Sequence, residues 1–101
     1  GYGDTATLEY VTSFSYQQVP QDELVGELAE YRRAVRRRME NVDIRVEFDP
    51  ECLPATVWWA VWDGIEGDVI DSEPVDLDSQ HSAERFLRSI ENTVVGFHWA
   101  W

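Results

Sequence analysis

Residues 56–64 read TVWWAVWDG, a run of β-branched and aromatic residues that ends in an Asp-Gly pair. Such residues favour β-strands and Asp-Gly is a favoured two-residue hairpin turn, so we predict a strand over residues 56–62. Successive residues of a strand point to opposite faces, which puts Trp58 and Trp62 on one face and Trp59 on the other. Both faces of this strand are therefore apolar, and both must be covered.

A second aromatic run, FHWAW, occupies residues 97–101. We predict a final strand over residues 93–101, and its alternation gathers three aromatic side chains on one face, Phe97, Trp99 and Trp101. We assign this set to the hydrophobic core, and His98 then points to the opposite face.

The remaining tryptophan pair, Trp58 and Trp62, is expected on the open face of the sheet. An exposed apolar patch of this kind usually marks an interface. Three coverings are open to it. The segment at residues 65–78 could fold over the face, a second copy of the chain could pack against it, or a different protein or a planar ligand could bind there.

Two other segments alternate with period two. Residues 5–16, TATLEYVTSFSY, are rich in β-branched and aromatic residues, and residues 42–48 alternate apolar side chains with charged ones. Both segments predict half-buried strands. After the Asp-Gly turn, residues 65–70 predict a short return strand. Residues 72–79 are expected to form a loop, because Pro74 would interrupt a ladder.

Helical spacing marks two further segments. Between residues 21 and 40, apolar residues recur every three or four positions, with acids in the first half and bases in the second, as the helix dipole favours. We predict a helix over residues 21–40. A second helix is predicted from a cap at Asp78 or Ser79 to Asn92. Its apolar face would consist of Ala83, Phe86, Leu87 and Ile90.

The predicted order of elements is strand, helix, strand, strand, short strand, helix, strand. This order indicates an α+β fold, in which an antiparallel sheet of four to five strands carries two helices on one face. The ferredoxin-like split βαβ arrangement is our first expectation. Residues 5–101 would form one domain of this kind. We set residues 1–4 aside as a cloning remnant or a flexible terminus.

The chain carries a net charge of −12, from 20 acidic residues against 8 arginines, and it has no lysine. This charge repels nucleic-acid phosphates and attracts basic surfaces, so we favour a basic protein partner over nucleic acid. Cys52 is the sole cysteine, which fits a reducing compartment, and we expect a cytoplasmic location. No apolar run is long enough to cross a membrane.

Charged residues suggest two candidate binding sites. The acids at and after the predicted turn would form a rim that attracts basic proteins. The proposed partner-binding residues are Trp58, Trp62, Asp63, Glu66 and Asp68. A helix over residues 21–40 would also gather a cluster of arginines that could bind an anion. These residues are Arg32, Arg33, Arg36 and Arg37.

We expect neither a metal nor a cofactor. The acidic run does not match a calcium-binding loop, and His81 and His98 lack metal-ligand spacing. The sequence contains no nucleophile elbow and no glycine loop for phosphate binding.

The sequence therefore favours a non-catalytic, acidic binding module that engages a basic protein, such as a toxin, a nuclease or a nucleic-acid-binding protein. It would act as an inhibitor, immunity or antitoxin-like protein, and homodimerisation could use the same sheet face. One alternative is a regulatory domain that binds a planar phosphorylated molecule on a tryptophan platform beside the arginines. A second alternative is a small enzyme that uses His81 or His98 with a carboxylate.

Overall fold

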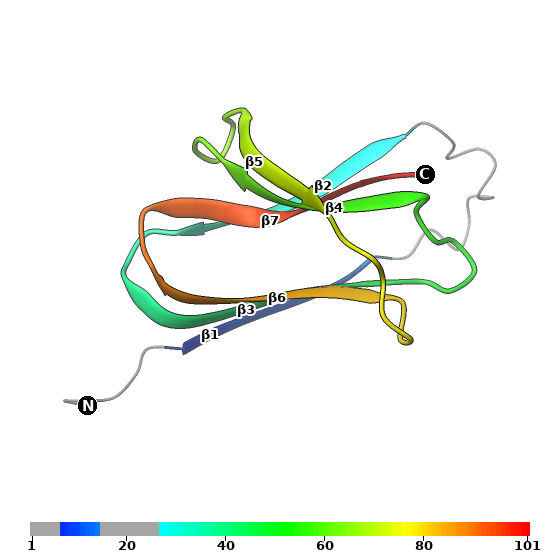
Figure 1. Cartoon of the computed structure of the whole chain (residues 1–101), viewed down its shortest axis with the longest axis horizontal. Helices are drawn as coiled ribbons and strands as arrows, with labels where there is room; N and C mark the ends of the chain where they lie inside the picture. The colour runs from blue at the N-terminus through cyan, green and yellow to red at the C-terminus, as the bar shows by residue number, and fades with distance from the viewer. Residues whose placement is uncertain (1–6, 15–26) are drawn as a thin grey trace.

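The computed structural model describes residues 7–14 and 27–101, with side chains described for residues 27–101. Every regular element in these residues is a β-strand, and the strands form two sheets (Figure 1). The strands are β1 (Thr7–Phe14), β2 (Leu28–Val35), β3 (Met39–Phe48), β4 (Thr56–Trp62), β5 (Val69–Pro74), β6 (Ser82–Ile90) and β7 (Thr93–Ala100).

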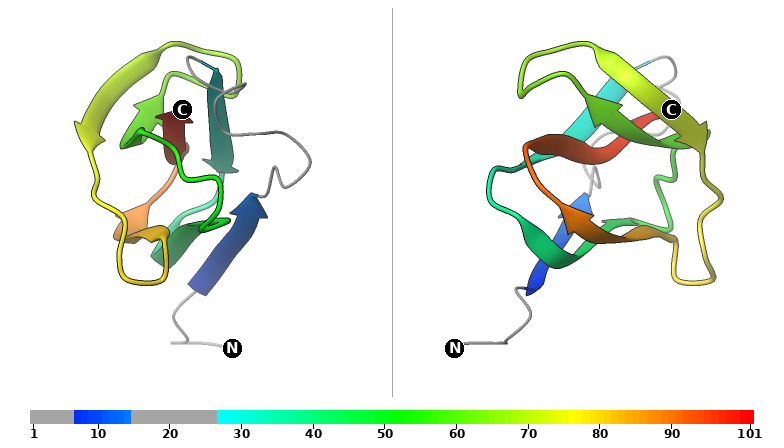
Figure 2. Two further views of the ribbon diagram at one scale, coloured as in Figure 1. Left: turned by 90° about the vertical axis from the view of Figure 1, so that its right-hand side faces the viewer. Right: turned by 60° about the vertical axis from the view of Figure 1, so that its left-hand side comes forward.

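The two sheets lie face to face as a β-sandwich (Figure 2). One sheet has three strands in the order β1-β3-β6, with β1 parallel and β6 antiparallel to the central β3. The other sheet has four strands in the order β2-β7-β4-β5, and all its neighbouring strands are antiparallel. β2 and β5 are therefore the two edges of the four-stranded sheet.

Aromatic side chains fill the space between the sheets. Phe97 and Trp99 on β7 are fully buried, and each meets another aromatic ring edge to face. The centroids of Trp59 and Phe97 are 5.3 Å apart, and those of Phe48 and Trp99 are 5.1 Å apart. The assignment of Phe97, Trp99 and Trp101 to the core is confirmed, because all three belong to one buried cluster with residues of both sheets.

The α+β, ferredoxin-like prediction is wrong, because both predicted helices are strands where the structure describes them. The first helix was predicted over residues 21–40, but residues 28–35 form β2. The next strand, β3, begins inside the predicted helix at residue 39 and continues to residue 48. In β2, Ala29, Tyr31 and Val35 pack toward the core. The spacing of Leu28, Tyr31 and Val35 fits a helix equally well, and the need to cover the aromatic core face decided between the two. Residues 21–26 of the predicted helix lie outside the described residues.

The second predicted helix is the strand β6. Ala83 and Leu87 pack against the core, whereas Phe86 is 70% exposed on the opposite face. The inward position between them holds Arg85, whose guanidinium carbon lies 5.4 Å from the centre of the Trp59 ring. Because the charged Arg85 stands between Ala83 and Leu87, the inward positions of β6 do not form a continuous series of apolar residues. The apolar residues that remain in this segment are spaced as they would be in a helix.

The predicted two-residue turn at Asp63-Gly64 is a longer loop over residues 63–68, and β5 begins only at Val69. The Asp63 amide donates to the Asp68 carbonyl over 2.9 Å, and Gly64 adopts a φ of 88° that favours glycine. The return strand therefore lies later than predicted, and its last residue is Pro74. The predicted strands at 42–48 and 56–62 are confirmed, and that at 93–101 is confirmed through Ala100.

Candidate functional site

The outer face of the four-stranded sheet carries Trp58 and Trp62, on the side of β4 opposite the core residues Val57 and Trp59. The alternation in TVWWAVW therefore predicted the correct orientation of all three tryptophans. The face is not open, however. Trp62 is only 2% exposed, and Trp58 is half-buried.

Arg32 on β2 covers Trp62 and holds the β4–β5 loop (residues 63–68) against the sheet. Its guanidinium carbon lies 4.6 Å from the centre of the Trp62 ring, a cation–π contact. Its Nη1 donates to the carbonyl oxygens of Ile65 and Gly67, over 2.8 and 2.9 Å. Arg32 also pairs with the Glu30 carboxylate, with an Nη2–Oε1 distance of 3.0 Å. Trp62 is thus covered within its own chain, by Arg32 together with the loop that Arg32 holds, whereas Trp58 stays half-buried.

His98 on β7 lies between the two outer tryptophans. Its ring stacks on Trp58 with centroids 4.8 Å apart, and it meets Trp62 at a steep angle with centroids 6.3 Å apart. Its Nε2 lies 3.1 Å from the hydroxyl oxygen of Ser72 on β5. These contacts tie β4, β5 and β7 together on the outer face, so Trp58 has one ring face occupied by the protein itself.

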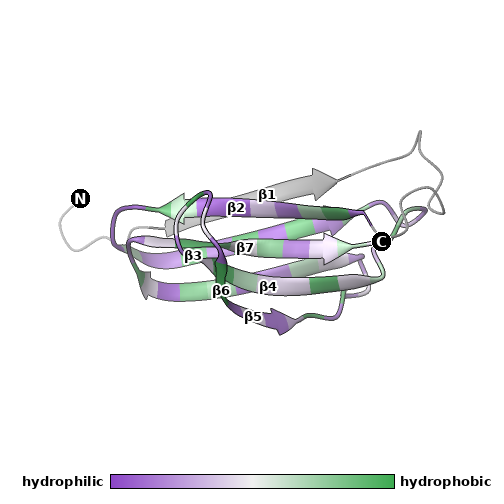
Figure 3. Ribbon diagram, turned by 90° about the horizontal axis from the view of Figure 1, so that it is seen from above, coloured by the Kyte–Doolittle hydropathy of each residue, from purple (hydrophilic) through white to green (hydrophobic). Residues whose placement is uncertain are grey.

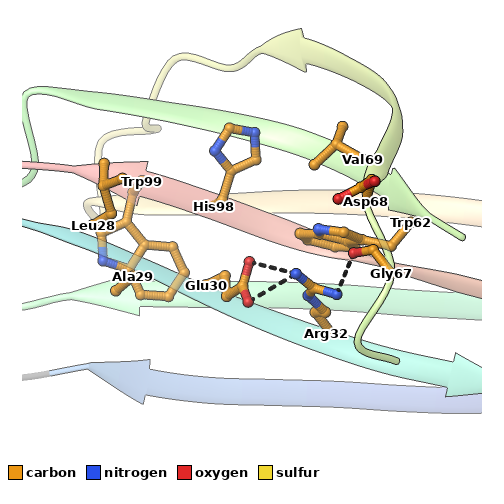
Figure 4. A pocket seen from close by; sticks show the side chains of 10 residues that line it. All are labelled: Leu28, Ala29, Glu30, Arg32, Trp62, Gly67, Asp68, Val69, His98 and Trp99. Atoms are coloured by element: carbon orange, nitrogen blue, oxygen red, sulfur yellow. Dashed lines mark hydrogen bonds and ion pairs between the residues drawn. The ribbon is translucent and has the colours of Figure 1, made fainter. Parts of the chain in front are cut away.

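A cavity of about 440 Å³ opens on this face between β2, β7 and the β4–β5 loop (Figure 4). Leu28, Trp62 and Val69 supply apolar walls, and Leu28 and Val69 are exposed at 77% and 44%. Polar groups enter from three elements: Glu30 and Arg32 from β2, Asp68 from the loop, and His98 from β7. The cavity thus combines exposed apolar surface with convergent charged groups, as ligand and partner sites do.

The charge of the cavity favours a cation. Arg32 is already bound to Glu30 and to two carbonyl groups, whereas Asp68 has no ion pair among the described residues. Burial lowers the pKa of His98, against the opposing effect of Glu30, so the imidazole is neutral at pH 7. Asp63 and Glu66 are exposed in the adjoining loop, which makes the rim of the cavity acidic.

Two buried donors at the cavity have no hydrogen-bond partner among the described residues, the indole Nε1 of Trp62 and the Nε of Arg32. An unpaired buried donor costs about 1–3 kcal/mol. Both atoms lie where Arg32 stacks on Trp62, beneath the β4–β5 loop.

The predicted arginine cluster is dispersed. Arg32 and Arg33 are neighbours on a strand, so their side chains leave opposite faces of the sheet. Arg36 and Arg37 are exposed in the connection between β2 and β3. The helical spacing that would have grouped them does not exist. Among the described residues, one face of Trp58 stacks on His98, and Arg32 lies over the ring of Trp62.

The two histidines occupy different settings. His81 lies in the turn before β6 with a φ of 60°, and its backbone bonds to Asp78 and Phe48. His98 is opposite Glu30 in the β2–β7 ladder, but the Glu30 carboxylate is engaged by Arg32. Within residues 27–101, neither histidine is hydrogen-bonded to a carboxylate side chain. No group of three or more potential metal ligands occurs among the described residues.

Sequence reasoning missed Leu28, Glu30 and Val69 in the cavity and the clamping role of Arg32. The sequence did contain a signal for them on β2. Leu28, Glu30 and Arg32 occupy alternate positions, so in a strand their side chains share one face. It was concealed because the same residues also fit a helix. The site residues Trp62 and Asp68 do line the cavity, whereas Asp63 and Glu66 lie in its rim loop.

In the residues that the structure describes, the fold and the site together define a seven-stranded β-sandwich with an acidic, partly apolar cavity on one outer face. Comparison with protein-family models, with curated proteins and with solved structures finds no match to this chain. Over residues 7–14 and 27–101, no helix has the length and apolar character needed to cross a membrane.

The lowered pKa of His98 predicts that acid destabilises the fold. The unfolded chain binds a proton near pH 6.5, while the folded chain resists protonation because the ring is partly buried. Well above pH 6.5, His98 is neutral in both states and does not change the free energy of unfolding. As the pH falls below 6.5, the unfolded chain takes up the proton more readily than the folded chain, so the free energy of unfolding declines. Denaturant unfolding between about pH 8 and 5.5 measures this decline. The variant His98→Gln, which cannot titrate, should show a shallower decline, and equal slopes would contradict the assignment.

Proposed function

We propose that this domain is a non-catalytic binding module that engages a basic protein partner at the outer face of the four-stranded sheet. The observation that carries the proposal is the cavity bounded by Glu30, Arg32, Trp62 and Asp68, with its acidic rim. The sole cysteine is buried and unpaired, which accords with a partner in the cytoplasm.

The cavity suits the side chain of a lysine or an arginine. Such a side chain has an apolar stem, which Leu28 and Val69 can contact, and a cationic head, which Asp68 can attract. One basic residue within a peptide would thus match both the charge and the apolar surface of the site.

Long-range attraction supports the same partner. The segment from residue 63 to residue 78 contains seven acids and no base, and it includes the cavity rim and β5. Surface charge of one sign raises the association rate with an oppositely charged partner and makes it sensitive to salt. An inhibitor or immunity-type protein that masks a basic surface would use these properties.

A lysine octapeptide and a glutamate octapeptide test the proposal by titration with tryptophan fluorescence detection. We expect the lysine peptide alone to bind, and its affinity to fall as salt rises from about 50 to 200 mM. The double variant Glu66→Gln/Asp68→Asn should weaken binding about three- to tenfold. The control Glu51→Gln/Glu91→Gln removes the same charge from two exposed positions in other loops and should change affinity less.

Equal weakening by the two double variants would show that net charge alone attracts the peptide, and the proposed site would be abandoned. Absence of any binding by the lysine peptide at low salt would contradict the proposed function as a whole.

A further inference from the structure

β5 is an exposed edge strand. All six of its residues, Val69–Pro74, are exposed, and it lies at the rim of the four-stranded sheet (Figure 3). Among the residues that the structure describes, β5 pairs with β4 on one side and with no strand on the other. Such an edge presents unpaired backbone amides and carbonyls that can pair with another extended chain.

The register identifies the outward amide. The Val75 amide donates to the Val57 carbonyl, so the pairs Trp59–Glu73 and Val61–Asp71 are the hydrogen-bonded ones in this antiparallel ladder. Ser72 lies between them in a non-hydrogen-bonded pair with Ala60. Its backbone N–H and C=O therefore point away from β4, toward the free edge.

The charges on β5 discriminate between occupants of this edge. Asp71 and Glu73 lie two residues apart and therefore on the same side of the strand, and Glu73 is ion-paired with Arg85 of β6. Asp71 has no ion pair among the described residues. A second copy pairing along β5 would bring like charges together, which destabilises a ladder. A strand with basic residues on that side would instead gain from Asp71.

We propose that the basic partner binds by strand addition, with an extended segment pairing along the free edge of β5. The segment carries lysine or arginine at alternate positions, on the side of Asp71 and Glu73. Its other side carries small or apolar residues that continue the outer face beside Ser72 and Val69, and Ile70, which is 66% exposed, adds apolar contact. This inference rests on the proposed function, because it assumes a basic partner and specifies how that partner is held.

A peptide with a blocked backbone separates strand addition from charge attraction. The probe is a heptapeptide in which lysine alternates with valine or threonine, and its counterpart carries N-methyl groups on alternate backbone amides. The two have the same charge, but the counterpart cannot complete the ladder. We expect the unmodified peptide to bind about tenfold more tightly, as the loss of one or two hydrogen bonds implies. Equal affinities would overturn strand addition while leaving the proposed function intact.

A pair of variants at Ser72 makes the complementary test on the protein. Ser72→Pro removes the outward amide without removing a bond to β4, and proline is accepted at such edge positions. Ser72→Ala loses the same hydroxyl contact to His98 but keeps the amide. We expect Ser72→Pro to weaken binding of the unmodified heptapeptide about tenfold and Ser72→Ala to leave it nearly unchanged.

Equal effects of the two variants, with both folded by circular dichroism, would overturn strand addition. If Ser72→Pro does not fold, the comparison between the two peptides on the natural chain decides the question. If neither the heptapeptides nor the lysine octapeptide bind, the proposed function fails and the inference fails with it.

Discussion

Replacing Trp62 by alanine is expected to lower the free energy of unfolding by about 3–5 kcal/mol, the range for removing a buried aromatic side chain. Trp62 is 2% exposed and packs with Ala60, Val94 and Ala34 on the outer face. Its removal leaves a cavity beneath Arg32 and also removes the ring on which the guanidinium lies. Denaturant unfolding monitored by circular dichroism measures the loss.

Trp58→Ala is the matched control, because Trp58 lies on the same face of the same strand. Trp58 is half-buried and its principal ring contact is His98, so we expect a smaller loss of about 1–2 kcal/mol. A loss for Trp62→Ala that is no greater than for Trp58→Ala would show that Trp62 is not enclosed by its own chain. The result also bears on function, since an enclosed Trp62 is not free to act as an exposed anchor for a partner.

Replacing Arg32 by methionine is expected to release the β4–β5 loop and to lower the free energy of unfolding by about 2–3 kcal/mol. Methionine keeps an apolar stem over Trp62 but cannot donate to the carbonyls of Ile65 and Gly67. The side chain of Arg32 is 18% exposed, so water screens part of the lost interaction and the estimate stays below that for Trp62.

Two measurements test this role of Arg32. Denaturant unfolding gives the global loss, and amide hydrogen exchange should speed up at Asp63 and Gly67, whose amides bond within the loop. The control Arg37→Met removes the same charge at an exposed position between β2 and β3 and should change stability by no more than about 0.5 kcal/mol. Unchanged exchange in the loop of the Arg32 variant would contradict the clamp.

The strands that sequence reasoning found are those with strong local signals. Residues 42–48 alternate apolar and charged side chains, and residues 56–62 are almost entirely β-branched or aromatic, so local preference and the final sheet agree. The helices it predicted over 21–40 and near 83–90 rested on spacing alone. The same spacing of apolar residues also arises in a strand when one of its inward positions holds an arginine. This is the case in β2, which has Arg33 at an inward position, and in β6, which has Arg85.

The candidate site was predictable in part. The outer-face tryptophans followed from alternation, and the acidic segment followed from composition. The covering of Trp62 did not, because Arg32 and the carbonyls of Ile65 and Gly67 are more than thirty residues apart in the chain. Such a contact arises only when β2 and β4 lie on either side of β7.

By itself, then, the sequence determined the orientation of side chains along each well-marked strand and the sign of the surface charge. These are local properties, fixed by the alternation of a strand and by the count of ionisable groups. The tertiary structure alone decided that residues 28–35 are extended, that Arg32 covers Trp62 on the second face of β4, and that β5 is left as an edge. Each of these depends on which segments meet across the core, and burying the aromatic face between two sheets selected that arrangement.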